Sequence, residues 1–208
     1  NIQIYINGSF YHRDEAKISV YDSGFLMGDG IWEGLRLVNN KWIFIDEHID
    51  RLFEGCKAID LDIKMTKEDI VNALDETKAI NNMSNEVHAR LMITRGNKSK
   101  PFQQPHLSES GINIVIIMEH SKPNTDLKNI TMATVPQVRG MPMSQDPKLN
   151  SHSKLNCILA CIQANKLGAD EALMLDPLGF VNTTNSCNFF IVKNNQVWTS
   201  TGDYCMNG

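Results

Sequence analysis

The segment at residues 18–36 limits the possible fold of this chain more than any other segment, because closely spaced glycines are followed directly by apolar residues. Its sequence is ISVYDSGFLMGDGIWEGLR, and the glycines at positions 24, 28 and 30 in its first part predict a loop that runs into a strand. A second motif, EHIDRL, occupies residues 47–52. Apolar residues at positions 49, 52, 53 and 56 there have the i, i+3, i+4, i+7 spacing of an amphipathic helix. The sequence therefore predicts a loop, a strand and a helix that packs along one face.

Arg51 lies at the edge of the apolar stripe of this helix, so its side chain can leave the helix sideways while the helix body packs. A guanidinium is planar and always charged, and its forked donors fit the oxygens of a phosphate. Taken alone, an arginine in this position is more often a solvated helix residue than a ligand.

Together the two segments resemble the pyridoxal-phosphate enzymes of fold type IV, which include branched-chain aminotransferases, D-amino-acid aminotransferases and aminodeoxychorismate lyase. The family pattern is D-x-G-F-x-x-G-D-G-x-[FYW]-E-G-x-R followed by E-H-[LIM]-x-R-L, and this chain matches both almost residue for residue. Residues 168–200 resemble the family's later motif, G-x-x-E-A and then G-x-V-x-E-x-x-x-x-N-x-F. The resemblance implies pyridoxal 5′-phosphate as cofactor, with Arg51 as the ligand of its phosphate.

Composition limits the partners and the compartment of the protein. A net charge of −4 over 208 residues, with no long basic run, argues against nucleic acid or an anionic membrane as partner. No apolar stretch approaches the length of a membrane span, and the N-terminus alternates like a strand rather than a signal peptide. The five cysteines are an odd count without close pairing, so we expect reduced thiols, no metal site and a cytoplasmic location.

The order of elements predicts an α/β (α+β) chain of two domains. We expect a small N-terminal α/β domain at residues 1–118, a linker at 119–126, and the first part of a larger, β-barrel-like cofactor-binding domain at 127–208. By resemblance, the sequence stops where the family continues with G-I-T-R and a phosphate-binding helix, so the C-terminal part of the fold is expected to be missing. The expected helices and strands, apart from an N-terminal hairpin and the strand after the glycine loop, are helices 47–59, 66–80 and 153–167 and strands 87–94, 112–118, 130–135, 171–175, 189–192 and 196–199. Thr66 and Asp69 are expected to form a capping pair at the start of the second helix, residues 96–111 a surface loop, and Asn194 and Asn195 a hairpin turn.

The cofactor ring is expected to contact a position where this chain departs from the family. Where the family has the glutamate that pairs with the pyridine nitrogen, this chain has Thr183, held in register by Gly179 and by Asn188, the family's final asparagine. A carboxylate there keeps the nitrogen protonated, whereas a threonine hydroxyl can only donate a hydrogen bond to an unprotonated nitrogen. The resemblance thus assigns Thr183 and Asn188 to cofactor binding, with a weaker electron sink than usual.

The second departure concerns the lysine that forms a Schiff base with the cofactor and moves the substrate proton. An ungapped alignment with the family places Asn150 at this position, and two lysines flank it, Lys148 and Lys154. We prefer Lys154 as catalytic and cofactor-binding residue, because Ser-Lys-Leu-Asn resembles the family's local K-x-L-N signature. A shift of four residues is about one helical turn, which a longer preceding loop can absorb.

Two residues are assigned to the substrate. Arg90 aligns with a family arginine that receives a substrate carboxylate, and Arg95 is the alternative, unless it only braces its loop. Trp32 replaces the Phe or Tyr usual at the pocket wall, with a role as a core aromatic as the alternative. The R-x-H pair of D-amino-acid aminotransferases is absent, because residues 97–100 read Asn-Lys-Ser-Lys.

Three functional hypotheses follow. The first is an aminotransferase that moves an amino group between an amino acid, aliphatic by resemblance, and a 2-oxo acid. The second is a lyase of the aminodeoxychorismate type, and the third is a non-catalytic homologue, motivated by Thr183 and the displaced lysine. The family and the apolar, glycine-rich run at residues 24–32 also predict a homodimer.

Overall fold

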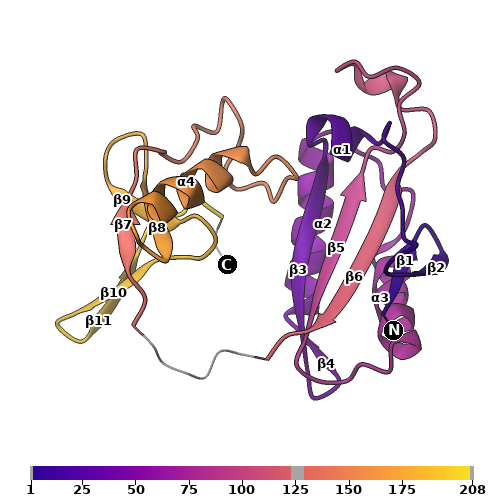
Figure 1. The fold of residues 1–208 in the computed structure, drawn as a ribbon, viewed down its shortest axis with the longest axis horizontal. Helices are drawn as coiled ribbons and strands as arrows, with labels where there is room; N and C mark the ends of the chain where they lie inside the picture. Colours follow the sequence, from indigo (N-terminus) through magenta and orange to yellow (C-terminus); the bar gives the residue numbers. More distant parts are fainter. Residues whose placement is uncertain (1, 123–128, 207–208) are drawn as a thin grey trace. The chain divides into compact units, whose positions relative to one another are not determined.

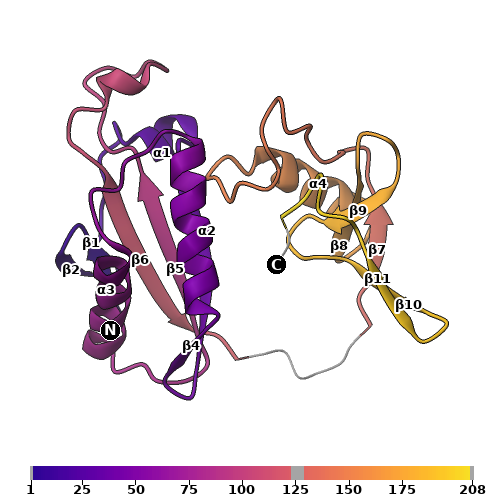
Figure 2. The same ribbon diagram turned by 180° about the vertical axis from the view of Figure 1, so that it is seen from behind.

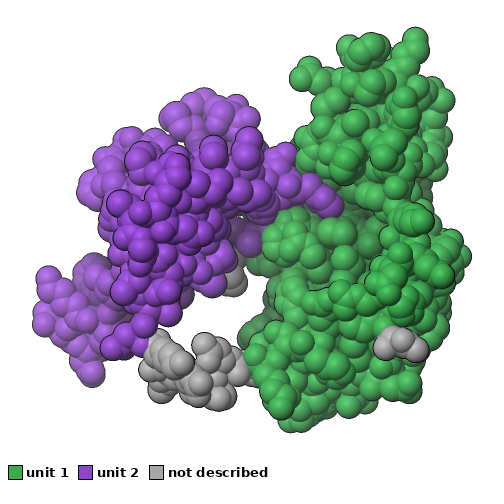
Figure 3. All heavy atoms as spheres, viewed as in Figure 1, with its two compact units in different colours: residues 1–125 green, residues 126–208 purple. Residues whose placement is uncertain are grey.

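In the computed structural model, which describes residues 2–122 and 129–206, the polypeptide folds as two units with separate cores. The units comprise residues 1–125 and 126–208 and are coloured separately in Figure 3. Residues 119 and 120, expected to begin a linker, instead end a strand because their backbone still pairs with the neighbouring strand. Residues 123–126 of the expected linker lie outside the described residues.

An antiparallel sheet of six strands, in the order β2-β1-β6-β5-β3-β4, forms the framework of the first unit. Every second residue of β3 and of most of β5 is buried, as period-2 apolar patterning dictates. The strands are β1 (Gln3–Ile6), β2 (Ser9–His12), β3 (Gly30–Val38), β4 (Lys41–Ile43), β5 (Val87–Thr94) and β6 (Asn113–His120).

Two helices, α2 (Ile45–Ala58) and α3 (Lys67–Ile80), cover the same face of this sheet, which Figures 1 and 2 show from opposite sides. Three residues of the predicted apolar stripe of α2, Ile49, Leu52 and Cys56, are buried, and Phe53 is partly buried. The helix starts two residues earlier than the sequence indicated. The predicted capping pair of α3 is confirmed, because Thr66 and Asp69 each bond the other's backbone. A short 3₁₀ helix, Pro105–Leu107, interrupts the expected loop at residues 96–111.

The glycine-rich loop contains a short helix, α1 (Ser23–Met27), that was not expected from the sequence. The side chain of Asp22 caps it by accepting from the backbone of Phe25, and Gly28 ends it with a φ of 70°. Gly24 is required by close approach, since a Cβ there would lie 2.4 Å from Cγ2 of Thr94. The glycines therefore allow one helical turn to pack against the end of β5.

The second unit is built on a three-stranded sheet in the order β7-β8-β9, with β7 and β8 parallel and α4 between them in sequence. Its small core contains Ala160 and Ala164 of α4 packed against Ala172 and Met174 of β8. The elements are β7 (Met132–Thr134), α4 (Leu155–Lys166), β8 (Glu171–Leu175), β9 (Val181–Thr184), β10 (Phe190–Lys193) and β11 (Gln196–Thr199).

Strand β9 was not expected, because Val-Asn-Thr-Thr has no apolar alternation that would mark it. The predicted hairpin turn at Asn194 and Asn195 is confirmed, and both residues have positive φ angles, as its two-residue loop requires. Strand β7 is shorter than expected. Helix α4 is also shorter and begins at Leu155, so Lys154 precedes it as its N-cap residue. Within the described ranges, no helix has the length and apolar character needed to cross a membrane.

Candidate functional site

The candidate phosphate ligand, Arg51, lies on α2 and forms an ion pair with Glu33 of β3. Its Nε donates to Oε1 of Glu33 over 2.8 Å, and its Nη2 donates to Oε2 over 2.7 Å. His48, three residues earlier on the same helix, places Nδ1 at 2.8 Å from Oε2. An ionised carboxylate can only accept hydrogen bonds, so Nδ1 of His48 is the donor. One carboxylate therefore holds both helix side chains.

This carboxylate is fully buried, with a side-chain exposure of 0%, whereas Arg51 is 27% and His48 21% exposed. Burial by itself would raise the pKa of Glu33, but the hydrogen bonds from Arg51 and His48 outweigh it, so the pKa lies below its ordinary value. The hydrogen bonds that Arg51 donates to Glu33 in turn raise the pKa of Arg51. Glu33 and Arg51 are consequently both charged at neutral pH.

The depressed pKa of Glu33 predicts a pH dependence of stability. In the folded protein this group binds its proton at lower pH than in the unfolded chain, where the pKa is near 4.5. Its contribution to the free energy of unfolding is therefore complete above pH 4.5 and decreases as the pH falls through the folded pKa. We expect wild-type protein to lose its stability advantage over Glu33→Gln in this acidic range, measured by urea unfolding at a series of pH values. An advantage that stays constant throughout the acidic range would contradict the assignment.

Trp32 and Arg90, both predicted at the substrate pocket, lie together on the sheet face opposite α2 and α3. The guanidinium carbon of Arg90 is 3.8 Å from the centroid of the Trp32 ring, a cation–π contact. His88 shares this face of β5, and a Cβ at Gly34 would lie 3.1 Å from its Nε2. Burial, and then the charges of Arg36 and Arg90, lower the pKa of His88. The structure thus places a neutral imidazole beside the two residues assigned to the substrate.

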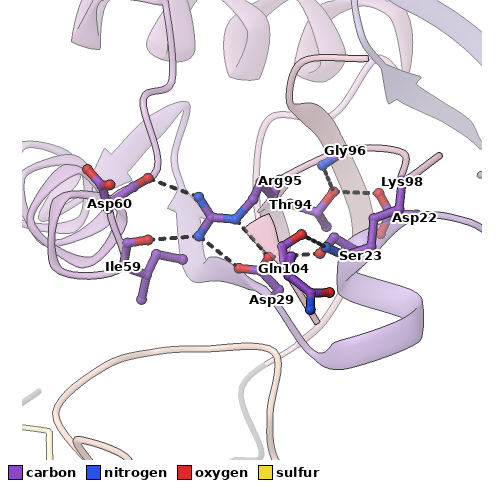
Figure 4. A network of polar contacts seen from close by, with 10 residues as sticks. All are labelled: Asp22, Ser23, Asp29, Ile59, Asp60, Thr94, Arg95, Gly96, Lys98 and Gln104. Atoms are coloured by element: carbon purple, nitrogen blue, oxygen red, sulfur yellow. Dashed lines mark hydrogen bonds and ion pairs between the residues drawn. The ribbon is translucent and has the colours of Figure 1, made fainter. Parts of the chain in front are cut away.

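Arg95, the alternative carboxylate ligand, is engaged in a brace around the glycine-rich loop (Figure 4). Its Nε and Nη2 donate to the two carboxylate oxygens of Asp29 over 2.8 and 3.1 Å. It also donates to the carbonyls of Ile59 and Asp60 at the end of α2. Burial raises the pKa of Asp29, but hydrogen bonds from Arg95 and Ser23 outweigh it and lower the pKa overall. These bonds support the bracing role that the sequence left open for Arg95.

Lys154 is half-buried and lines a cavity of about 240 Å³ in the second unit. Arg139 lines the same cavity, and its Nη1 lies 3.2 Å from Sγ of Cys157. Lys148 is exposed and does not line this cavity. Asn150, where an ungapped alignment puts the lysine, is buried, and its Oδ1 has no hydrogen-bond partner among the described residues. Of the two lysines, Lys154 is the one that lines the cavity.

Thr183 and Asn188, the predicted cofactor contacts of the second unit, lie opposite each other in an isolated β-bridge. Thr183 is buried, and its hydroxyl donates to the carbonyl of Cys187 over 2.7 Å. The amide of Asn188 donates to the carbonyl of Met206 over 3.1 Å. To donate to a ring nitrogen, the Thr183 hydroxyl would have to rotate away from Cys187.

Sequence reasoning missed two residues of these clusters, Glu33 and His88. A signal for each was present, because Glu33 has the same parity along its strand as the apolar residues at positions 31 and 35, and His88 is two residues before Arg90. An acidic residue at a position that must face the core indicates a buried partner of opposite charge.

Comparison with known proteins shows which sequences and folds this chain resembles. A sequence model described as amino-transferase class IV matches residues 30–208. The branched-chain-amino-acid aminotransferase-like protein 2 of Arabidopsis thaliana is 38% identical over 197 residues, which are 94% of this chain and 35% of that protein. The D-alanine aminotransferase of Staphylococcus haemolyticus is 28% identical, over 99% of this chain and 72% of that protein.

Solved structures share the fold. The branched-chain aminotransferase of the thermophilic archaeon Thermoproteus uzoniensis, crystallised with norvaline, superposes with a TM-score of 0.87 at 24% identity, covering 99% of this chain and 70% of that chain. The chain thus has the mixed α/β fold of these enzymes. It spans about a third of the length of the Arabidopsis relative and about 70% of the solved chain.

Proposed function

Because the chain belongs to the class IV aminotransferase family, we propose that the protein transfers an amino group between an aliphatic amino acid and a 2-oxo acid with pyridoxal 5′-phosphate as cofactor. The observation that carries this proposal is the family match over residues 30–208, which includes every residue assigned to the site. The names of the relatives, branched-chain and D-alanine aminotransferases, support amino transfer but leave the amino acid and its configuration open.

The chemistry of the residues present fits the cofactor. Arg51 offers a fixed guanidinium for the phosphate, Lys154, which lines a cavity, offers an amine for the aldehyde, and Thr183 offers a buried hydroxyl for the ring nitrogen. The second unit also buries amide oxygens of Asn150 and Asn182 that have no hydrogen-bond partner within the described residues. Buried oxygens of this kind fit a site that is completed by a polar ligand.

When bound, pyridoxal phosphate supplies an aldehyde that takes up the amino group and a ring that withdraws electrons from the substrate. Lys154 would move the proton between the substrate Cα and the cofactor carbon, with Arg51 holding the phosphate and Asn188 supporting the ring-facing turn. Arg90 would receive the substrate carboxylate, with its guanidinium plane set by the stack on Trp32.

We also propose a homodimer and a reducing, cytoplasmic environment. Phe25 and Met27 of α1 and Val20 and Tyr21 just before it are 37–67% exposed, an apolar surface that a second subunit would cover. The free cysteines of the structure support the reducing environment. A monodisperse, cofactor-loaded monomer in light scattering would argue against the dimer.

The test of the function is an amino-transfer screen on the purified protein. Aliphatic amino acids of both configurations are incubated with 2-oxoglutarate, and the glutamate formed is measured. We expect glutamate with at least one of them and none without an amino donor. Pyruvate released from aminodeoxychorismate without a 2-oxo acid would show the lyase instead. Bound cofactor with neither reaction would show the non-catalytic homologue that Thr183 suggests.

A further inference from the structure

Glu33 is an unusual residue for its position in the first core. It lies in the middle of β3, on the face covered by α2, between the fully buried Ile31 and Leu35 and opposite Leu91 of β5. A charge in such surroundings is unfavourable unless it is paired, and an apolar side chain would suit the core at least as well. Stability of the core therefore gives no reason to prefer this ion pair over apolar side chains.

The carboxylate does determine the orientation of Arg51. Bonds from Nε and Nη2 to the two oxygens of one carboxylate fix the plane of the guanidinium, and with it the direction of Nη1. Glu33 itself cannot turn, because it is enclosed by the sheet and by α2 and also accepts from His48. An arginine without such a partner has many rotamers, and a ligand must select one of them on binding.

We infer that Glu33 is a positioning residue, which holds Arg51 in the orientation that binds the cofactor phosphate. This inference rests on the proposed role of Arg51. His48 supports the same arrangement, since its hydrogen bond to Oε2 keeps the carboxylate satisfied when Arg51 shares its charge with a second anion. Glu33 itself touches neither substrate nor cofactor in this scheme.

Binding of pyridoxal 5′-phosphate and of pyridoxal, which lacks the phosphate, separates positioning from a general structural role. We expect Glu33→Gln to raise the Kd of pyridoxal 5′-phosphate about three- to tenfold, the effect of ordering one long side chain on binding, and to leave the Kd of pyridoxal unchanged. A residue that only stabilised the fold would change both Kd values alike or neither, and that result would overturn the inference.

Two further variants complete the experiment. The matched control is Asp29→Asn, which removes a second, partly buried carboxylate–arginine pair of the same unit, with Arg95, and should leave the ratio of the two Kd values unchanged. Should Glu33→Gln fail to fold, Glu33→Asp keeps the charge but shortens the reach to Arg51. It should reduce the preference for the phosphate about threefold, and an unchanged preference in Glu33→Asp would overturn the inference.

Arg51→Lys separates failure of this inference from failure of the proposed function. If Arg51→Lys leaves the ratio of the two Kd values unchanged, the role of Arg51 itself is wrong. If Arg51→Lys lowers the preference for the phosphate but Glu33→Gln does not, Arg51 binds phosphate without help from Glu33, and only the positioning role fails.

Discussion

Replacing Lys154 with alanine is expected to lower the rate of amino transfer by about two to four orders of magnitude, the contribution of a positioned acid–base group. The amine of Lys154 is the group that would move the proton at the substrate Cα, and among the described residues no other lysine lines the same cavity. The rate is measured as glutamate formed per unit time at saturating cofactor. Borohydride reduction followed by peptide mapping should find the cofactor attached to Lys154.

Lys148→Ala is the matched control for this prediction. Lys148 lies six residues earlier in the same polar loop, but it is exposed and outside the cavity. We expect its replacement to change neither the rate nor the labelled peptide. A label on Lys148, or a loss of activity in Lys148→Ala that matches that of Lys154→Ala, would transfer the catalytic role to Lys148.

Replacing Arg51 with alanine is expected to lower the free energy of unfolding by about 3 kcal/mol, the lower end of the range for breaking a buried ion pair. Within the described part of the chain, the fully buried Glu33 carboxylate then retains only its hydrogen bond from His48. The lower end applies because Arg51 itself is partly exposed and His48 remains. Urea unfolding of the apoprotein at neutral pH measures the effect without any contribution from cofactor binding.

The double variant Glu33→Leu/Arg51→Leu tests whether the unpaired charge causes this loss. Apolar replacement of a whole buried pair is often neutral or stabilising, so we expect the double variant to recover most of the free energy lost in Arg51→Ala. It should still lack the preference for a phosphate-bearing cofactor. A double variant as unstable as Arg51→Ala would mean that packing by the arginine stem, rather than the charge of Glu33, accounts for the loss.

Much of the fold follows from local patterns in the sequence. The strand at residues 87–94 and the capping pair of α3 were predicted as observed, because β-strand alternation and helix caps depend on neighbouring residues alone. Helix α1 was missed, since its formation depends on Asp22 being fixed by Thr94 and Asn113 from distant strands. Strand β9 depends in the same way on pairing with β8 rather than on its own polar residues.

Single residues of the candidate site were predictable from the sequence, but the contacts between them were not. The position of Arg51 at the edge of the apolar stripe of α2 was clear from helical spacing, but its partner lies 18 residues earlier, on a strand. The stack of Arg90 on Trp32 likewise depends on the pairing of β3 with β5, which no local pattern specifies. Cross-strand neighbours are set by the register of the whole sheet, so a single sequence does not reveal them.

The pairing of Glu33 with Arg51 also limits how this protein can evolve. A lineage that loses either residue first passes through a form with a buried, uncompensated charge or a misoriented guanidinium, and proteins sit only slightly above their stability threshold. The two codons are therefore expected to change together or not at all. In an alignment of homologous sequences, positions 33 and 51 should therefore covary. The pair should be retained even in homologues whose specificity for the amino acid substrate differs.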